Sequence, residues 1–372
     1  MADDFFPEEI LETLRKDPLN SALSPTVIRD FSIAKKFSDN KAAVSSLDYN
    51  LTGTFCITTS HDESLRIYDC MRGTREQVLY SKKYGCNLAC FTGQPGYVAY
   101  ASTKINDTIR YLSFETNQYL RYFVGHSAFV TSLQRNNDGR CLMSASVDGS
   151  VRLWDLNTVN ATSTAKVGGQ IGGVAAAYDP SGMVVAVAVD ANQIQLLDVR
   201  EFSRGPFASW SISNTTGDPS LMSKPVVSGI RFIPPLGDLL LLAMTDGSTQ
   251  LWDTQTSSHI ATLSAGPTNT MGKTEEKEEA PAIEFMKRTF LGQNLSVTPD
   301  GSTVLCGGRD GNVAYWDVKR ILQTSERDGQ VAISPDGLWS GSHTGPVGVC
   351  AFNPFVMECF TAATSLSIWS IR

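Results

Sequence analysis

The sequence has few histidines and no closely paired cysteines. Only four of its 372 residues are histidine, and none of its eight cysteines forms a Cys-x-x-Cys pair. Because structural zinc sites need clustered cysteine or histidine ligands at short spacings, we expect no metal site. Scattered cysteines of this kind are typical of small core residues in a reducing compartment. The sequence indicates no cofactor either.

Long hydrophobic runs and an excess of basic residues are also missing. The longest aliphatic run, Leu239 to Met244, has the length of a strand, so we expect no membrane span. The chain begins with Met1-Ala2-Asp3-Asp4 rather than with an apolar targeting segment. A formal net charge of −7 and a pI near 5.2 argue against a direct nucleic-acid surface, which needs many Lys and Arg residues.

The clearest positive feature is the segment from Gly125 to Asp155. It begins with Gly-His, ends with Trp-Asp, and contains short apolar runs separated by Asp-Gly turns. Alternating strands joined by such turns form antiparallel hairpins. A Gly-His opening and a Trp-Asp ending, inside a unit of roughly 40 to 45 residues, are typical of one blade of a WD-repeat β-propeller.

Four side chains of this segment can form one buried polar chain. His126 can bond the carboxylate of Asp148 and, through its other ring nitrogen, the hydroxyl of Ser144 or Ser146. That hydroxyl can accept the indole N–H of Trp154, so that each donor has an acceptor. The alternative is a His/Ser/Asp catalytic relay, which needs an open pocket and an oxyanion site. We therefore expect a structural role for these side chains and no catalytic residue.

The same unit recurs along the whole chain. The predicted third strands of the blades end at Asp69, Ser113, Asp155, Asp198, Asp253, Asp317 and Ser370. The first four endings are 42 to 44 residues apart, and the later spacings are wider. One four-stranded blade cannot bury both of its faces alone. Seven endings therefore predict an all-β, seven-bladed WD-repeat β-propeller over residues 31–372.

The seventh blade needs an outer strand from elsewhere in the chain, because the sequence stops at Arg372, two residues after the last ending. The run from Phe31 to Phe37 precedes the first strand of blade one (Val44 to Tyr49) and fits as that strand. Closure of the ring by this N-terminal strand would remove the exposed sheet edges of an open ring.

The rest of the chain divides into an extension and insertions. Residues 1–30 form an expected N-terminal extension, in which 7–16 has helical spacing. Insertions are expected at about 213–223, 265–288 and 320–334. The second contains the charged run 273–279, which favours a flexible excursion, and the third has the composition of a linker. In blade seven, His343 could bridge strands as His126 does, although a matching turn acid is missing.

Several segments go beyond a generic propeller. They include Leu-Tyr-Ser-Lys-Lys-Tyr-Gly at 79–85 and His-Thr-Gly-Pro at 343–346, together with 104–113, 119–126, 198–202, 205–207 and 352–354. Together these segments resemble the WD-repeat subunit shared by two nuclear assemblies. One is COMPASS, the Set-domain complex that methylates histone H3 on its fourth-position lysine. The other is the cleavage and polyadenylation factor with its phosphatase module.

The resemblance implies a non-catalytic scaffold in the nucleus. This assignment comes from the resemblance alone, because a propeller fold fits many functions. Such a scaffold acts in histone H3 methylation and in mRNA 3′-end processing and transcription termination. The implied partners are the Set-domain methyltransferase subunit and subunits of the cleavage and polyadenylation factor, including the phosphatase module. The resemblance further implies a monomeric ring that docks peptide segments of these partners.

We expect the partner-binding surface on blades one to three, where loops carry aromatic and basic residues that the fold does not need. The candidates are Tyr80, Lys82, Lys83, Tyr84, Lys104, Asn106, Arg110 and Arg121. Tyrosine can anchor an extended peptide, and lysine can steer an acidic one. Ordinary polar loops are the simpler interpretation. A reader of a phosphorylated or methylated tail is the functional alternative, and it would need a basic pocket or an aromatic cage.

Overall fold

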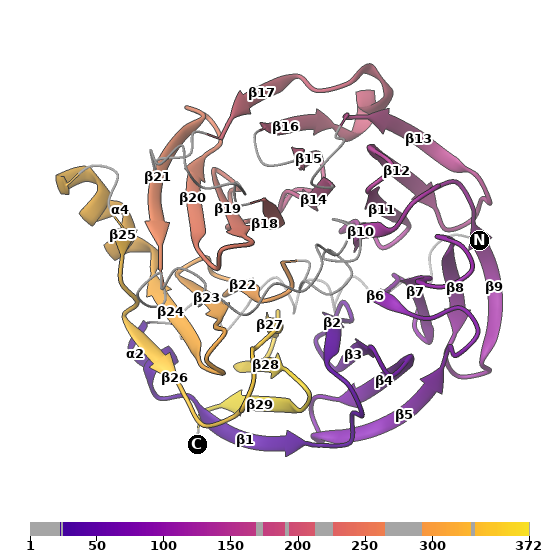
Figure 1. Ribbon diagram of the computed structural model, residues 1–372, viewed down its shortest axis with the longest axis horizontal. Helices are drawn as coiled ribbons and strands as arrows, with labels where there is room; N and C mark the ends of the chain where they lie inside the picture. Colours follow the sequence, from indigo (N-terminus) through magenta and orange to yellow (C-terminus); the bar gives the residue numbers. More distant parts are fainter. Residues whose placement is uncertain are drawn as a thin grey trace, which may run out of the picture.

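The computed structural model describes residues 23, 25–168, 174–189, 193–212, 226–264, 292–328 and 332–371. These residues form seven sheets arranged as a closed ring around a central axis (Figure 1). The predicted seven-bladed β-propeller is therefore confirmed. The helix expected at 7–16, the insertion at 213–223 and the insertion at 265–288 with its charged run lie outside the described residues.

The first four blades are regular antiparallel sheets. Blade one comprises β2 (Val44–Tyr49), β3 (Phe55–Ser60), β4 (Ser64–Asp69) and β5 (Thr74–Tyr80). Blade two comprises β6 (Asn87–Phe91), β7 (Tyr97–Ala101), β8 (Ile109–Ser113) and β9 (Gln118–Phe123). Blade three comprises β10 (Val130–Arg135), β11 (Cys141–Ser146), β12 (Ser150–Asp155) and β13 (Ala161–Lys166). Blade four comprises β14 (Val174–Tyr178), β15 (Val184–Val189), β16 (Gln193–Asp198) and β17 (Ala208–Ser211), with the 3-10 helix η1 (Val199–Arg204) before its last strand.

The last three blades carry the irregular features. Blade five comprises β18 (Val227–Phe232), β19 (Leu239–Met244), β20 (Thr249–Asp253) and β21 (Ser258–Leu263). Blade six comprises β22 (Leu295–Val297), β23 (Thr303–Gly307), β24 (Val313–Asp317) and β26 (Gly337–Trp339). Blade seven comprises β27 (Val349–Phe352), β28 (Glu358–Ala362), β29 (Leu366–Ser370) and, as its outer strand, β1 (Ser32–Phe37).

All seven third strands end at the residues that the sequence predicted. The acidic residue at the end of the strand explains several of these endings, because its carboxylate binds the backbone of the following turn. The Oδ1 atom of Asp69 accepts the N–H of Arg72, and Oδ1 of Asp155 accepts the N–H of Asn157. The turn that ends each of these strands is thus encoded locally.

The ring is closed by the N-terminal strand, as predicted. Strand β1 pairs antiparallel with β29, and the two lie side by side at the rim (Figure 1). The preceding helix α2 (Pro25–Arg29) packs on the same blade through Ile28, which is fully buried. Leu23 is also part of this core cluster. Residues of the expected N-terminal extension therefore already contribute to the core.

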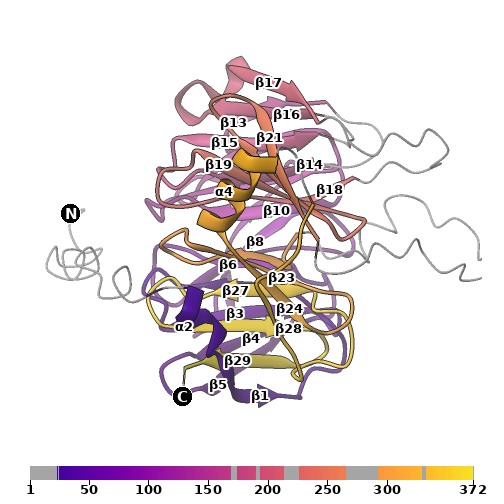
Figure 2. The same ribbon diagram turned by 90° about the vertical axis from the view of Figure 1, so that its left-hand side faces the viewer.

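The interpretation of residues 320–334 as a linker is wrong. Helix α4 (Val318–Asp328) begins directly after β24, and β25 (Ala332–Ile333) then pairs in parallel with β21 of blade five. Figure 2 shows α4 on the rim of the ring, where Ile321 is buried and Ser325 Oγ donates to Ile260 O at 2.7 Å. The chain thus covers the outer edge of blade five before it returns as β26.

The hydrophobic core lies between blades rather than inside them. One cluster joins Tyr111 and Phe123 of blade two to Val130 and Trp154 of blade three. Every cluster likewise combines strands of neighbouring blades, which is the arrangement expected when single blades cannot bury both faces. The resulting ring is a rigid support for the loops between the strands.

Candidate partner-docking surface

In blade three, four side chains form the His126 network (His126, Ser144, Asp148 and Trp154). The Nδ1 atom of His126 lies 2.9 Å from Asp148 Oδ2, and its Nε2 lies 2.7 Å from Ser144 Oγ. Trp154 Nε1 donates to the same Ser144 oxygen at 2.8 Å. With Nδ1 protonated, each donor meets one acceptor along the chain. The other hydroxyl considered, that of Ser146, donates to Ala128 O instead.

The polar groups of the His126 network form their hydrogen bonds with one another. Burial raises the pKa of Asp148, but hydrogen bonds from His126 and Ser150 outweigh this effect and hold the pKa below its usual range. Ser144 and Trp154 are fully buried. The serine oxygen is therefore shared between two partners and shielded from solvent. This geometry suits a link between strands and not a nucleophile.

Blade seven carries a related network without an acid. His343 Nε2 lies 2.9 Å from Thr361 Oγ1, which also accepts the indole N–H of Trp369 at 2.8 Å. The place of the aspartate is taken by the Ser365 hydroxyl, 3.2 Å from His343 Nδ1. Burial, with a smaller effect of Lys36, lowers the pKa of His343 to about 4. A neutral imidazole is thus built into this blade.

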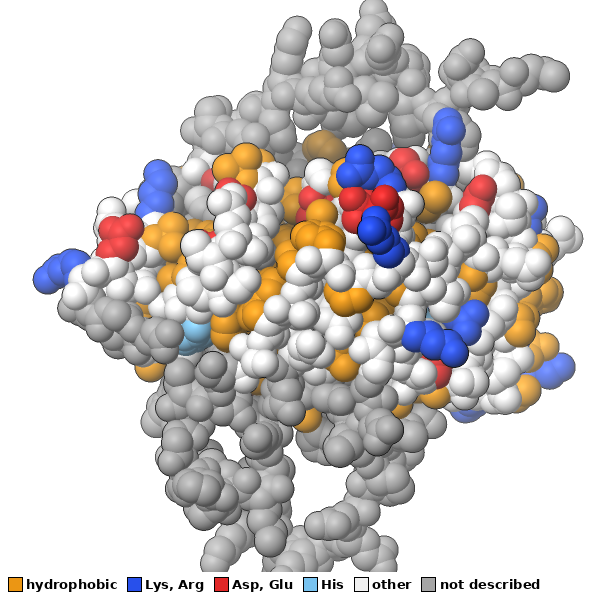
Figure 3. All heavy atoms as spheres, turned by 90° about the horizontal axis from the view of Figure 1, so that it is seen from above, with side chains coloured by type: hydrophobic (Ala, Val, Ile, Leu, Met, Phe, Trp, Pro, Cys, Tyr) orange, Lys and Arg blue, Asp and Glu red, His pale blue; other side chains and the backbone are white. Residues whose placement is uncertain are grey.

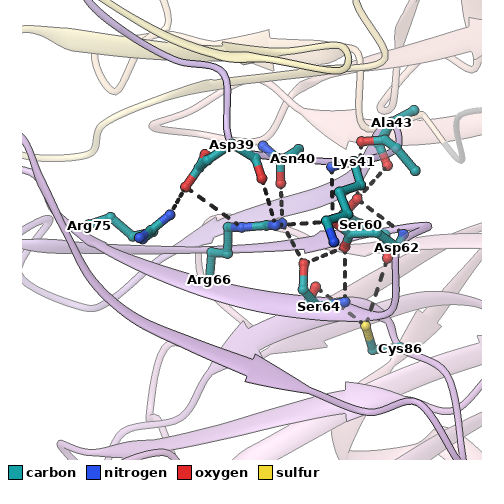
Figure 4. A network of polar contacts seen from close by, with 11 residues as sticks. Asp39, Asn40, Lys41, Ala43, Ser60, Asp62, Ser64, Arg66, Arg75 and Cys86 are labelled. Carbon is teal, nitrogen blue, oxygen red and sulfur yellow. Dashed lines mark hydrogen bonds and ion pairs between the residues drawn. The ribbon is translucent and has the colours of Figure 1, made fainter.

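Blade one contains a third polar network, centred on Arg66, which the sequence analysis did not single out. Arg66 has the strand position of Arg152 in blade three, and not that of His126. Arg66 on β4 is 3% exposed, and its Nη2 lies 3.0 Å from Asp62 Oδ2. The guanidinium also binds Asn40, Ser64 and the carbonyl of Asp39 (Figure 4). Burial raises the pKa of Asp62, but hydrogen bonds from Ser64 and Arg66 dominate and lower it. The network ties β4 to the segment that follows the closing strand β1.

Most of the predicted partner-binding residues lie together at the outer side of blades one and two. Tyr80, Lys82, Lys83 and Tyr84 lie at the end of β5 and in the loop after it, whereas Lys104 and Asn106 lie in the loop between β7 and β8. The two loops are joined, because the N–H groups of Thr103 and Lys104 donate to Tyr84 O at 3.0 and 2.8 Å. The structure thus brings two separate sequence segments onto one surface.

Gly85 is the residue that allows these loops to meet. Its φ is 66°, in the left-handed region that favours glycine. A Cβ atom at this position would collide with the side chain of Thr103. The turn before it is closed by the N–H of Gly85, which donates to Ser81 O at 2.7 Å.

Arg110 on β8 lies at the centre of the joined loops, enclosed by three tyrosines. Its Cζ atom lies 3.4 Å from the ring centroid of Tyr84, 5.1 Å from that of Tyr122 and 5.6 Å from that of Tyr119. The residue is 4% exposed, so these cation–π contacts are largely shielded from water. Its Nε donates to Ser102 Oγ at 2.8 Å, and Nη2 lies 3.5 Å from Asn106 Oδ1. Among the described residues, Arg110 forms no ion pair.

Two of the predicted residues take other roles. Arg121 on β9 is directed to blade three, where its Nη1 donates to the carbonyl of Leu156. Lys104 forms an ion pair with Glu63 of blade one. In contrast, Lys82 and Lys83 are exposed, and their ammonium groups lie 5.5 and 5.1 Å from the ring centroids of Tyr80 and Tyr84. These two lysines form no ion pair with any residue that the structure describes.

The candidates from the sequence included Arg121 of β9 but not the two tyrosines of that strand. Tyr119 and Tyr122 complete the enclosure of Arg110, and Tyr119 Oη lies 2.8 Å from Tyr100 Oη. The sequence does place two aromatic residues on this outer strand, where solvent-facing polar residues are usual, and this pattern could have indicated a binding role. We define the docking surface as Tyr80, Lys82, Lys83, Tyr84, Arg110, Tyr119 and Tyr122.

The docking surface is apolar as well as basic. Tyr80 is 57% exposed and Tyr122 is 44% exposed, and the neighbouring Ile105 reaches 72%. On the side of the ring seen in Figure 3, basic and acidic side chains lie in small mixed groups. Ion pairs such as Arg200–Asp198 belong to that kind of surface. The docking surface differs from that mixed-charge surface because its exposed aromatic residues lie beside lysines that form no ion pair.

The described residues contain no group of three or more His, Cys, Asp or Glu side chains that could hold a metal ion. The same part of the chain contains no helix long and apolar enough to cross a membrane. Its eight cysteines are all unpaired.

Seven blades of four strands, with β25 added to blade five and β1 closing blade seven, and the His126 network define a WD-repeat β-propeller. Consistent with this class, the family model described as WD domain, G-beta repeat, matches residues 31–69, 117–155 and 293–317. A relative from Drosophila melanogaster, WD repeat-containing protein 82, is 30% identical over 347 residues, which cover 93% of this chain and 96% of that protein. The chain belongs to the family of WD repeat-containing protein 82 and Swd2, which confirms the resemblance noted in the sequence.

Two fungal relatives carry more specific names. COMPASS component SWD2 of Saccharomyces cerevisiae is 32% identical over 276 residues, 74% of this chain and 76% of that protein. Set1 complex component swd2 of Schizosaccharomyces pombe is 37% identical over 165 residues, 44% of this chain and 45% of that protein.

Proposed function

We propose that this protein is a non-catalytic scaffold subunit of a nuclear Set1/COMPASS-type complex that methylates histone H3 on lysine four. Membership of the family and the names of the two fungal relatives support this proposal. The observation that carries it is the docking surface, where exposed tyrosines and two unpaired lysines lie on a rigid ring. The partner that this surface would hold is a segment of the Set-domain methyltransferase subunit.

The second part of the proposal is a role in mRNA 3′-end processing and transcription termination. The partners there would be subunits of the cleavage and polyadenylation factor, including its phosphatase module. The support is the resemblance of the sequence segments at 79–85 and 104–113, which form the loops of the docking surface. One surface used in two assemblies would make their partners compete for a single ring.

A non-catalytic role fits the internal chemistry of the blades. The one His/Ser/Asp constellation predicted from the sequence is the His126 network, and its serine oxygen is shared between His126 and Trp154. Burial raises the pKa of most of the thiols, Cys86 to about 12 among them, so these cysteines are poor nucleophiles. The ring therefore offers binding surfaces rather than reactive groups.

The docking surface favours an acidic peptide. Tyrosine side chains bury a large area at a low cost in conformational entropy, so Tyr80 and Tyr122 can anchor an apolar residue of a partner. Lys82 and Lys83 lack carboxylate partners among the described residues, so a partner's acidic side chains would supply them. The binding energy would then come from tyrosine contacts, and the lysines would contribute to the association rate and to specificity.

Recognition of a modified peptide is the alternative function, and its two forms, methylated and phosphorylated, need different surroundings. An aromatic cage for methyl-lysine needs an empty space between rings. Here the space between Tyr84, Tyr119 and Tyr122 is filled by the chain's own Arg110 guanidinium. That arrangement disfavours a methylated ligand, whereas the unpaired lysines are compatible with a phosphorylated one.

The experiment that tests complex membership is affinity purification of the tagged, full-length protein from nuclear extract, with partners identified by mass spectrometry. We expect the Set-domain methyltransferase subunit and subunits of the cleavage and polyadenylation factor. Recovery of only one group would restrict the proposal to that assembly. Recovery of neither group would contradict it.

A further inference from the structure

The centre of the ring contains a polar cavity that the docking surface does not use. Its volume is about 350 Å³, and it is lined by inner-strand residues of blades one to six. Seven of its lining residues have a charged or amide side chain, namely Asp48, Gln134, Arg135, Asn137, Asp179, Arg231 and Gln293. A cavity of this size and polarity can hold a small polar ligand.

In each blade, one backbone N–H closes the turn between the first and second strands; in blade one it is that of Asn50, which donates to Phe55 O. The residue two positions earlier lies at an equivalent place in every blade, close to the central axis. At this position, three blades carry a side-chain oxygen that accepts a backbone N–H of the next blade. The pairs are Asp48 with Phe91 at 2.9 Å, Gln134 with Tyr178 at 3.1 Å and Ser296 with Phe352 at 2.9 Å. An acceptor at this position therefore joins neighbouring blades around the channel.

Blade five has Arg231 at the same ring position, two residues before Ile233. A guanidinium has five donors and no acceptor, so it cannot form the bond that Asp48, Gln134 and Ser296 form. The same position holds Cys90, Ala177 and Ala351 in the remaining blades, so Arg231 is the one charged donor there. Arg231 lines the channel, and it forms no hydrogen bond or ion pair with any residue that the structure describes. Burial lowers its pKa, although the nearby charge of Asp48 opposes this effect.

The other charges in the channel do not satisfy Arg231. Arg135 is also a cation, and its Nη1 donates to Phe91 O at 3.1 Å. The carboxylate of Asp48 is bound to the N–H of Phe91, and burial raises its pKa although Arg135 and Arg231 oppose this effect. Asp179, at the edge of the cavity, accepts hydrogen bonds from the turn that contains it. Two guanidinium groups thus face a cavity whose carboxylates are already engaged.

We propose that the central channel binds a small oxyanion, a phosphate or a carboxylate, which Arg231 holds and Arg135 assists. A planar guanidinium can bind such a group through two parallel N–H···O bonds, and a partly buried site strengthens them. The bound anion would restore at blade five the acceptor that Asp48, Gln134 and Ser296 supply elsewhere. Ligand binding and the joining of blades around the ring would then be coupled.

The test is thermal unfolding of the full-length protein in sodium phosphate or sodium succinate, against sodium chloride at equal ionic strength. A ligand that binds the folded state raises the melting temperature, and the stabilisation grows with the logarithm of its concentration above Kd. We expect stabilisation of the wild type by at least one anion, and the more effective anion identifies the ligand as a phosphate or a carboxylate. Arg231→Gln should bind about tenfold more weakly or worse, since a charge-assisted hydrogen bond is worth about 1.5–3 kcal/mol.

Two further variants serve as controls. Arg204→Gln removes an exposed arginine that pairs with Glu201 outside the channel, and it should respond as the wild type does. Asp48→Asn keeps an acceptor for Phe91 but removes a negative charge that repels the anion, so its anion affinity should rise. If neither anion stabilises the wild type, or if Arg231→Gln is stabilised as strongly, the site does not exist. Weaker binding by Asp48→Asn would also contradict it.

Discussion

The indole nitrogen of Trp339, in the outer strand of blade six, donates a hydrogen bond to the carbonyl oxygen of Ile28 at 3.0 Å. Phe31 stacks on the same indole with 5.2 Å between ring centroids and 2° between ring planes. Residues 311 positions apart in the sequence are thereby joined beside the closing strand. The N-terminal segment is thus bound both by strand pairing and by an aromatic contact.

Truncation of the N-terminus should reveal this double attachment. Deletion of residues 1–37 removes β1, Ile28 and Phe31, and it should lower the melting temperature sharply or abolish soluble expression. Deletion of residues 1–22 stops before Leu23, the first core residue in the described part of the chain, and should leave the melting temperature close to that of the full chain. The single change Phe31→Ala should cost about 3 kcal/mol. Equal stability of the two truncations would contradict closure by this segment.

The His126 network should contribute to stability and not to binding. His126→Ala leaves the carboxylate of Asp148 without its imidazole partner, and we expect a loss of about 1–3 kcal/mol in the free energy of unfolding. Urea denaturation measures this loss, with Ser127→Ala, an exposed neighbour, as the control. Partner binding per folded molecule should be unchanged. A stable His126→Ala protein with lost binding would instead make His126 part of a binding site.

Two buried groups should give stability opposite dependences on pH. The folded-state pKa of His343 is lowered to about 4 from 6.5. Between these values the unfolded chain binds a proton that the folded chain does not, so stability falls as the pH falls, by at most about 1.4 kcal/mol per unit. Burial raises the pKa of Glu358 to about 7 from 4.5. Between these values the folded chain holds the extra proton, so stability falls as the pH rises.

Single variants separate these opposing contributions. Glu358→Gln leaves the histidine contribution, and its free energy of unfolding should decrease as the pH is lowered from 6.5 to 4.5. His343→Gln leaves the glutamate contribution, and its free energy of unfolding should increase over the same interval. Urea denaturation at several pH values measures both slopes. Parallel slopes in the two variants would contradict the assignment.

The Arg66 network should be strongly coupled. Arg66→Met leaves the carboxylate of Asp62 buried and unpaired, which we expect to cost about 3–5 kcal/mol. The double variant Arg66→Met, Asp62→Asn removes both charges and should recover a large part of this loss. Additive losses in the two single variants and the double variant would show that the two side chains act independently.

The repeat could be predicted from the sequence because the residues that specify each blade lie close together in the chain. Each third strand ends in a turn, and acids such as Asp69 and Asp155 specify that turn through their own backbone contacts. His126 and Trp154 likewise lie inside one repeat, so their spacing indicated their contact. The closing strand was predicted from a missing partner rather than from its own composition.

Other features depend on contacts between distant segments, and the sequence alone could not indicate them. Helix α4 is short and charged, and Ile321 gains its burial only from the neighbouring cluster of blades five and six. Arg66 shares its strand position with Arg110 and Arg152, but its contacts with Asn40 and Asp39 come from the segment after β1, which the repeat does not specify. Tyr119 and Tyr122 acquire a role only because Arg110 of the adjacent strand lies between them and Tyr84.

The central claim is that the docking surface binds partner subunits, and co-purification of a charge-reversed variant tests it most directly. Lys82→Glu with Lys83→Glu should reduce recovery of the methyltransferase or 3′-end processing subunits about tenfold, equivalent to about 1.4 kcal/mol of binding free energy. The matched control, Lys166→Glu with Lys319→Glu, makes the same charge change at exposed lysines of blade three and α4 and should retain both partner groups. Circular dichroism and melting temperature should match the wild type in both variants. Full recovery of both partner groups by Lys82→Glu with Lys83→Glu would contradict the claim.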